Sequence, residues 1–271
     1  MVVAISLRPE SETRRRRKRA MLAIRRWACS GRGSLVTWPG CLSDSAARDR
    51  AGMGYSEPGP MPRTLERLSS DLGAMIQGAR LPPPYLLAGS SAGGIVVRHY
   101  AAKHPADVCG LVLIDSPHED FTLPRSREKA IRSARLGVWL SRLGLLRLID
   151  PFHLGADRAA RATAYRPQAL EAGASLVENL EPSLKELRKL PPLRADLPLV
   201  VLTHTRHGEL LGVDPEEERE AERRWRELER ALAGKSSRGR LVVAEGSGHL
   251  IAAERPDLLV RALLDTLAVC R

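Results

Sequence analysis

Residues 84–115, which read PYLLAGSSAGGIVVRHYAAKHPADVCGLVLID, constrain the fold more than any other part of the chain. They hold an apolar run, a turn of small residues, an amphipathic segment that ends at Pro105, and a second apolar run. Apolar residues recur at helical spacing between Ile95 and Ala102, whereas the flanking runs are short and continuous, as in buried strands. The pattern predicts strand, sharp turn, helix, strand, and hence an α/β fold with a mostly parallel sheet.

The turn in this stretch, Gly89-Ser90-Ser91-Ala92-Gly93, fits the pattern G-x-S-x-G. In such a nucleophile elbow the central serine lies on a strained turn with its hydroxyl exposed, and the glycines let strand and helix pass closely. The pattern alone is weak and also fits a Gly/Ser loop between core elements. Its position between an apolar strand and an amphipathic helix is the context that the motif requires, so Ser91 is the candidate nucleophile.

Four segments, taken in chain order, resemble motifs of the α/β-hydrolase family. The resemblance covers residues 49–271, leaves out the first 48 residues, and implies a mostly parallel sheet flanked by helices with an inserted helical cap. It divides the chain into a core of residues 49–117 and 194–271 and a cap of residues 118–193. The matching segments are residues 49–56 (DRAGMGYS), the elbow around Ser91, residues 111–115, and residues 246–249 (GSGH) followed by 254–256 (ERP).

The resemblance also implies a catalytic triad in the chain order serine, acid, histidine. His249 is the expected base because it follows a predicted strand in a glycine-containing loop, where the imidazole can lie over Ser91. The family commonly carries the acid after its seventh strand, but residues 205–208 (TRHG) hold no carboxylate. Asp115, at the end of the sixth strand, is therefore the preferred acid. Two later carboxylates, Glu209 and Asp214, stay open as alternatives.

The family stabilises the oxyanion with two backbone N–H donors, one from the residue after the nucleophile and one from a loop after the third strand. Ala92 supplies the first donor. The second normally comes from a His-Gly loop ahead of residue 49, and the sequence there shows no such loop.

The N-terminal segment is atypical, since residues 1–50 hold twelve Lys and Arg against four Asp and Glu and so carry most of the net charge of +11. Residues 1–48 are expected to be poorly ordered, and the first strands of the sheet to be incomplete. Short apolar runs at residues 2–7, 21–24 and 34–38 are candidates for replacement strands. The Arg-, Ser-, Gly-, Trp- and Cys-rich composition of residues 8–48 is typical of a GC-rich gene translated out of frame or from an alternative start.

Composition and charge indicate which other kinds of site and partner to expect. The four cysteines (Cys29, Cys41, Cys109 and Cys270) show no paired framework and no metal-binding spacing, so free thiols in a reducing compartment are expected. No apolar run approaches the roughly 20 residues of a membrane-spanning helix, which predicts a soluble, cytoplasmic protein. The basic run at residues 14–19 and the charged segment at residues 214–230 are interpreted as solvated surface, so neither predicts a nucleic-acid partner.

The function that follows is a serine hydrolase that cleaves an ester or similar acyl bond through an acyl-enzyme and needs no cofactor. Serine as nucleophile argues against the dehalogenases of the family, which carry a carboxylate there. The apolar cap predicts a small-molecule substrate with a hydrophobic part, although such faces serve packing first. The alternative is a non-catalytic or crippled member that acts as a binding protein. The apolar cap residues are Leu136, Val138, Trp139, Leu143, Leu145, Leu146 and Leu148.

Overall fold

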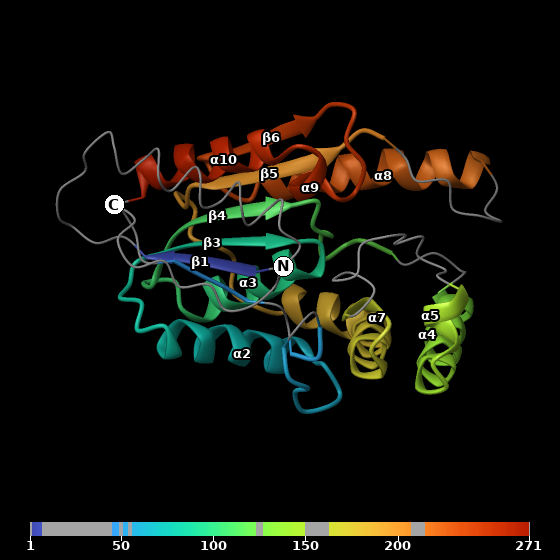
Figure 1. The fold of residues 1–271 in the computed structure, drawn as a ribbon. Helices are drawn as coiled ribbons and strands as arrows, with labels where there is room; N and C mark the ends of the chain where they lie inside the picture. The colour runs from blue at the N-terminus through green and yellow to red at the C-terminus, as the bar shows by residue number, and fades with distance from the viewer. Residues whose placement is uncertain are drawn as a thin grey trace.

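The computed structural model describes residues 2–6, 45–48, 51–53, 56–122, 127–149, 163–206 and 215–270. Its centre is a six-stranded sheet with the strand order β2-β1-β3-β4-β5-β6 (Figure 1). The four strands from β3 to β6 are parallel, whereas β1 is antiparallel to both of its neighbours. The strands are β1 (Val2–Ser6), β2 (Ser45–Arg48), β3 (Tyr85–Ser90), β4 (Val108–Ile114), β5 (Leu199–His204) and β6 (Gly239–Ala244).

The predicted α/β fold with a mostly parallel sheet is confirmed, and the apolar runs of the sequence correspond to β3 through β6. The elbow helix α3 (Ala92–Lys103) ends before Pro105, as the sequence indicates. The last helix, α10 (Pro256–Val269), begins at a proline, whose fixed φ suits the first turn of a helix.

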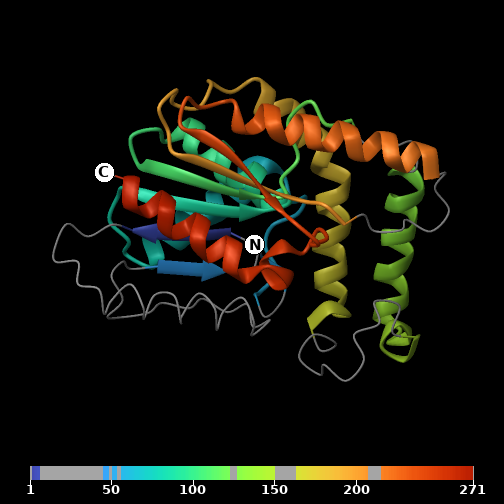
Figure 2. The ribbon, with the colours of Figure 1, turned by 90° about the horizontal axis from the view of Figure 1, so that it is seen from above.

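Helices cover both faces of the sheet because the central strands are apolar on both sides. Side chains such as Leu87 and Leu113 pack in the cluster that includes residues of α2 (Leu65–Gly78), α3 and α8 (Pro215–Ala233). The alternate side chains, such as Leu86 and Val112, pack in a second cluster with α10. Figure 2 shows α10, in red, on one side of the strands and α3, in teal, on the other.

Residues 1–48 were expected to be poorly ordered, but residues 2–6 form strand β1, so the expectation is wrong for these residues. Its Val2 and Ala4 pack in one cluster and Ile5 in the other, so the strand contributes to both faces of the core. It lies beside β3, and Leu86 of β3 is completely buried. The segment just before residue 49 also forms a strand, β2, at the edge of the sheet. Residues 7–44, including the run at 14–19, lie outside the described residues.

Three helices from the segment expected to be the cap lie beyond the carboxyl ends of the parallel strands (Figures 1 and 2). They are α4 (Arg127–Arg142), α5 (Leu145–Ile149) and α7 (Pro167–Arg188). Ion pairs join α4 to α7, with Arg135 Nε 2.7 Å from Glu178 Oε1. None of the helices in the described ranges is long and apolar enough to cross a membrane.

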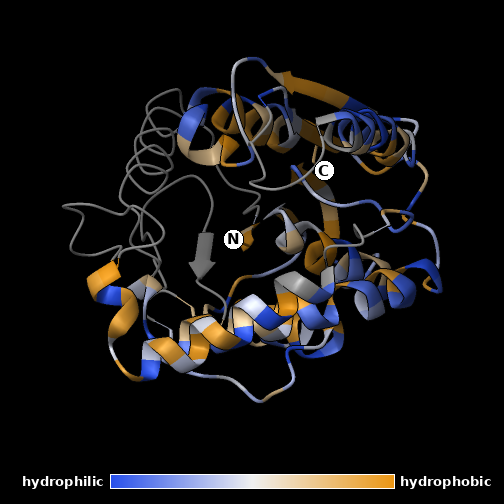
Figure 3. Ribbon diagram, turned by 90° about the vertical axis from the view of Figure 1, so that its right-hand side faces the viewer, coloured by the Kyte–Doolittle hydropathy of each residue, from blue (hydrophilic) through white to orange (hydrophobic). Residues whose placement is uncertain are grey.

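The outer face of α4 and α5 does not pack as the sequence predicted. Leu146 is buried, but Trp139 is 58% exposed and Leu148 is 81% exposed. Both helices belong to a single outer layer, so the side that faces away from α7 has no described element against it. Figure 3, which colours the ribbon by hydropathy, shows apolar residues along the helices nearest the viewer. Leu136, Leu143 and Leu145 are exposed as well.

A disulfide joins Cys109 of β4 to Cys270, which follows α10, and the two Cα atoms are 5.1 Å apart. The expectation of free thiols is therefore wrong for these two residues. They lie 161 positions apart in the sequence, and only the packing of α10 across β4 brings them together. Cys29 and Cys41 lie outside the described residues.

Candidate active site

Ser91 occupies a strained turn between β3 and α3, with φ 53° and ψ −126°. Non-glycine residues rarely adopt a positive φ, and such strain often marks functional positions. The turn is tight: a Cβ on Gly89 would lie 2.3 Å from the carbonyl oxygen of Gly93, and one on Gly94 would lie 2.2 Å from Ser116 Oγ. These close approaches explain why the sequence has glycines around Ser91.

Asp115 follows β4, beside the elbow, since the Ser91 N–H donates to the carbonyl of Ile114 at 2.8 Å. Its own N–H bonds Leu202 O of β5 at 2.8 Å, which holds the turn at a φ of 49°. The side chain is completely buried. Asp115 is therefore a buried carboxylate fixed at the carboxyl edge of the parallel sheet.

His249 reaches this edge from the loop after β6. Its Nδ1 lies 2.5 Å from Asp115 Oδ2, and its side chain is 51% exposed. The loop is tied to the end of β5, because the N–H groups of Thr205 and Arg206 both donate to Ser247 O. The structure thus brings the predicted acid and the predicted base together, at the edge where the strand before Ser91 also ends.

Two further donors to Asp115 were not recognised in the sequence. His204, the last residue of β5, has its Nδ1 2.8 Å from each carboxylate oxygen of Asp115. Trp225 of α8 donates from Nε1 to Oδ1 at 3.0 Å. Burial acts to raise the pKa of Asp115, but the hydrogen bonds from His204 and His249 outweigh it and lower this pKa below its ordinary value. The carboxylate is consequently held in its ionised form.

The sequence signal for Trp225 was present but was interpreted as part of a solvated helix. Trp225, Leu228 and Leu232 recur at helical spacing within the charged segment. In α8 this stripe faces inward, where Leu228 and Leu232 are buried. The prediction of a wholly solvated surface is wrong for this face of the helix.

Comparison with known proteins identifies the family. A family model described as "Alpha/beta hydrolase family" matches residues 25–262, which is most of the chain. The chain belongs to the alpha/beta hydrolase family. The match begins before residue 49, so the expectation that the first 48 residues stand apart from the family is wrong for residues 25–48.

Relatives and solved structures agree with this assignment. The chain is 25% identical to "Uncharacterized protein YqjL" from Bacillus subtilis, over 80% of this chain and 70% of that protein. A thermophilic esterase from Thermogutta terrifontis superposes with a TM-score of 0.59 at 22% identity, over 93% of this chain and 86% of that one. The haloalkane dehalogenase DatA from Agrobacterium tumefaciens superposes with a TM-score of 0.58 at 14% identity, over 83% and 80%. The fold is thus shared by proteins described with different activities.

Two glutamates of α8 lie near the group formed by Asp115, His204 and His249. Glu222 Oε1 is 3.3 Å from His204 Nε2. Glu229 is almost completely buried. Burial, and then the negative charge of Asp115, raise the pKa of Glu229 to about 9. Glu229 therefore keeps its proton at neutral pH, which avoids a second negative charge beside Asp115.

Because Glu229 keeps its proton in the folded protein, the free energy of unfolding is expected to depend on pH. Since the unfolded chain titrates this group near 4.5 and the folded protein near 9, stability falls as the pH rises between these values. At pH 7.5 the cost is about 4 kcal/mol. We expect Glu229→Gln to raise the free energy of unfolding at pH 8 much more than at pH 5, as measured by urea denaturation. Glu220→Gln, at an exposed position of the same helix, is the control. An equal effect at both pH values would contradict the prediction.

The other predicted site positions are less well defined. Glu209 and Asp214, the alternative acids, lie outside the described residues. Ala92 is the first residue of α3, directly after the nucleophile position. The second oxyanion donor was expected from a loop that follows the strand beside β3. That strand, β1, runs the opposite way, with Val2 opposite Gly89 and Ser6 opposite Tyr85. The chain after β1 therefore starts at the far end of the sheet.

Two groups in the described ranges combine residue types that bind metals. In the group of Asp115, His204 and His249, both Nδ1 atoms are within hydrogen-bonding distance of the carboxylate. The other group, Glu66, His99 and Glu186, lies among α2, α3 and α7. In it His99 Nε2 is 3.1 Å from Glu186, and Lys103 donates to Glu66. Hydrogen bonds within each group account for its geometry.

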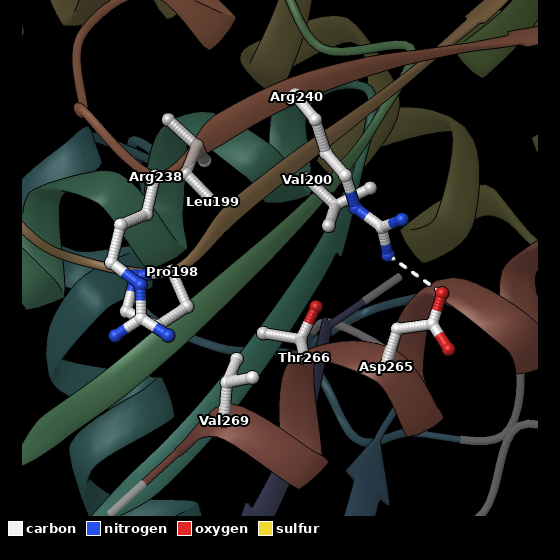
Figure 4. A pocket seen from close by; sticks show the side chains of 8 residues that line it. All are labelled: Pro198, Leu199, Val200, Arg238, Arg240, Asp265, Thr266 and Val269. Carbon is white, nitrogen blue, oxygen red and sulfur yellow. Dashed lines mark hydrogen bonds and ion pairs between the residues drawn. The ribbon is translucent and has the colours of Figure 1, made fainter.

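A pocket of about 310 Å³ lies at the opposite edge of the sheet, where β5 and β6 begin. Figure 4 shows Arg240 reaching across it to Asp265 of α10, with 2.9 Å between Nη2 and Oδ2. Its lining includes none of Ser91, Asp115 or His249. This pocket is distinct from the candidate active site.

Proposed function

We propose that this hydrolase cleaves an ester or similar acyl bond through an acyl-enzyme on Ser91. The observation that carries the proposal is the 2.5 Å contact between His249 Nδ1 and Asp115 Oδ2, at the edge of the sheet where the strand before Ser91 ends. A serine hydroxyl needs a base to become nucleophilic, and that base needs a third group to orient it. Asp115 is such a group, because it is buried, ionised and fixed by its own N–H.

Each residue has a defined role in this mechanism. Because Asp115 holds Nδ1 of His249, Nε2 is the nitrogen that accepts the Ser91 proton as the hydroxyl attacks the acyl carbon. The resulting imidazolium then protonates the leaving group, and in the second half-reaction His249 activates water in the same way. The Ala92 N–H donates to the oxyanion that forms in each step.

The substrate is proposed to be a small molecule with a hydrophobic part. Helices α4, α5 and α7 lie beyond the carboxyl ends of the strands and are proposed to form a cap over Ser91. Their many apolar residues favour an apolar acyl or alcohol group. The likeness to an esterase supports the reaction type, but a dehalogenase superposes similarly, so Ser91 rather than the fold carries this proposal.

A second candidate function is a crippled member of the family that binds ligands without turnover. The direction of β1 favours it, because β1 ends at Ser6, opposite Tyr85 at the start of β3 and not beside the elbow. Loss of one oxyanion donor costs about 10²- to 10³-fold in turnover.

A fluorophosphonate probe tests the proposal, since it reacts with a serine only when a base activates it. We expect peptide mapping to find the label on Ser91 and on no other serine. His249→Ala should abolish labelling, whereas His104→Ala, which changes an exposed histidine just after α3, should leave it unchanged. Label on Ser90, or a labelled His249→Ala variant, would refute the triad. A folded wild-type protein that takes no label would favour the non-catalytic alternative.

A further inference from the structure

His204 lies between two carboxylates. Its Nδ1 is 2.8 Å from both oxygens of Asp115, and its Nε2 is 3.3 Å from Glu222 Oε1. The side chain is only 10% exposed, so water screens these contacts poorly. A neutral imidazole carries a proton on one nitrogen and a bare lone pair on the other. In this position the bare lone pair would face a carboxylate oxygen, and both contacts are favourable only when both nitrogens are protonated.

The charges around His204 favour the same form. Among the described residues, the titratable groups around it include Asp115 after β4, Glu222 on α8 and His249 in the loop after β6, and Glu229 of α8 lies near Asp115. Asp115 is ionised and Glu229 keeps its proton, so Asp115 and Glu222 supply the negative charge near the ring. The hydrogen bond to Asp115 outweighs burial and raises the pKa of His204 above its ordinary value. Geometry and charge therefore both favour the imidazolium form of His204.

His204 and His249 share one carboxylate. Their ring centroids are 6.5 Å apart, and both Nδ1 atoms are directed at Asp115. A carboxylate that faces only the triad histidine places its full charge on that imidazole. Here the cationic His204 and the Trp225 N–H both donate hydrogen bonds to the same two carboxylate oxygens, so less of their negative charge acts on His249.

We propose that His204 is a positioning residue of the triad: as a cation it shares Asp115 with His249 and limits how strongly Asp115 favours the protonated form of His249. This rests on the proposed function for its effect on catalysis. The proton that His249 takes from Ser91 is then passed on more readily to the leaving group. His204 touches no reacting atom and acts only through Asp115.

Two variants separate the effect of the charge on His204 from the effect of a hydrogen bond to Asp115. His204→Gln removes the cation and keeps a donor, whereas Trp225→Phe removes a donor and leaves the cation. We expect His204→Gln to move the acidic limb of the pH dependence of fluorophosphonate inactivation upward by about one unit, since a charge within a few ångströms has effects of this size. Trp225→Phe should move it much less. Glu222→Gln, which weakens the charged form of His204, should move it in the same direction by a smaller amount.

A second measurement does not depend on activity. Titration of the histidine Cε1–H signals by NMR in the free protein reports directly on His249. We expect its midpoint to rise by about one unit in His204→Gln and to stay unchanged in His104→Gln. If the wild type takes no label, the proposed function fails but this titration still decides the role of His204. An unchanged His249 midpoint in His204→Gln, or an equal rise in Trp225→Phe, would overturn the proposal.

Discussion

Replacement of Ser91 by alanine is expected to reduce ester turnover on the order of 10⁶-fold, the size of the loss when a triad serine is removed. The reason is chemical, because His249 and Asp115 can activate a hydroxyl but cannot replace it as the group that carries the acyl chain. The variant should fold, because an alanine in this turn keeps the Cβ and the backbone bond to Ile114. The measurement is kcat on a panel of p-nitrophenyl esters of increasing acyl length.

The neighbouring serine provides the matched control. Ser90 is the last residue of β3 and pairs with Ile114 of β4, so it shares the local backbone but not the strained turn. Ser90→Ala should retain wild-type turnover within a few-fold. Full activity in Ser91→Ala together with a loss in Ser90→Ala would move the nucleophile by one residue and contradict the elbow assignment.

The sequence predicted the half of the sheet that carries the site. Strands β3 to β5 are short, apolar and buried, so their local pattern and their role in the core agree. The apolar run of β6 was predicted too, although β6 lies at the edge of the sheet and only its Ala244 is buried. The elbow was predictable for the same reason, since the glycines that the turn requires lie next to each other in the chain. Local patterns therefore located the turn at Ser91 and the loop of His249, and chain order located Asp115.

The remaining features depend on contacts between distant segments, which local patterns do not report. His204 and Asp115 are 89 positions apart, and Trp225 and Asp115 are 110 apart. The register of β4 against β5, with Ile114 opposite Leu202, places His204 beside Asp115, and the packing of α8 against β5 adds Trp225. The disulfide between Cys109 and Cys270 was not predicted for the same reason, because the two cysteines lie 161 positions apart in the sequence. Strand β1 was considered only as a makeshift strand, because five residues next to an Arg-rich segment carry little information about pairing.

Replacement of Asp115 by asparagine is expected to reduce turnover by about 10⁴-fold, the loss seen when a triad acid becomes its amide. Three side chains contact the Asp115 oxygens: His249, His204 and Trp225. An amide offers one accepting oxygen and an NH₂ group that would face one of these donors, so His249 loses either its partner or its orientation. The same variant should also lose stability, because a buried donor left without an acceptor costs about 1 to 3 kcal/mol.

The comparison with the two later carboxylates makes this result decisive. Glu209→Gln and Asp214→Asn change side chains in the loop where the family commonly carries the acid, and each should cost less than tenfold in kcat. Melting temperatures of all three variants separate a folding defect from a catalytic one, and kcat is compared only among variants that are folded at the assay temperature. Because His249 Nδ1 already lies 2.5 Å from Asp115, a carboxylate from the later loop would have to displace that contact in order to orient the base. A folded Asp115→Asn variant with near-normal kcat, beside an inactive Glu209→Gln or Asp214→Asn variant, would show that this displacement occurs and would transfer the acid to the later loop.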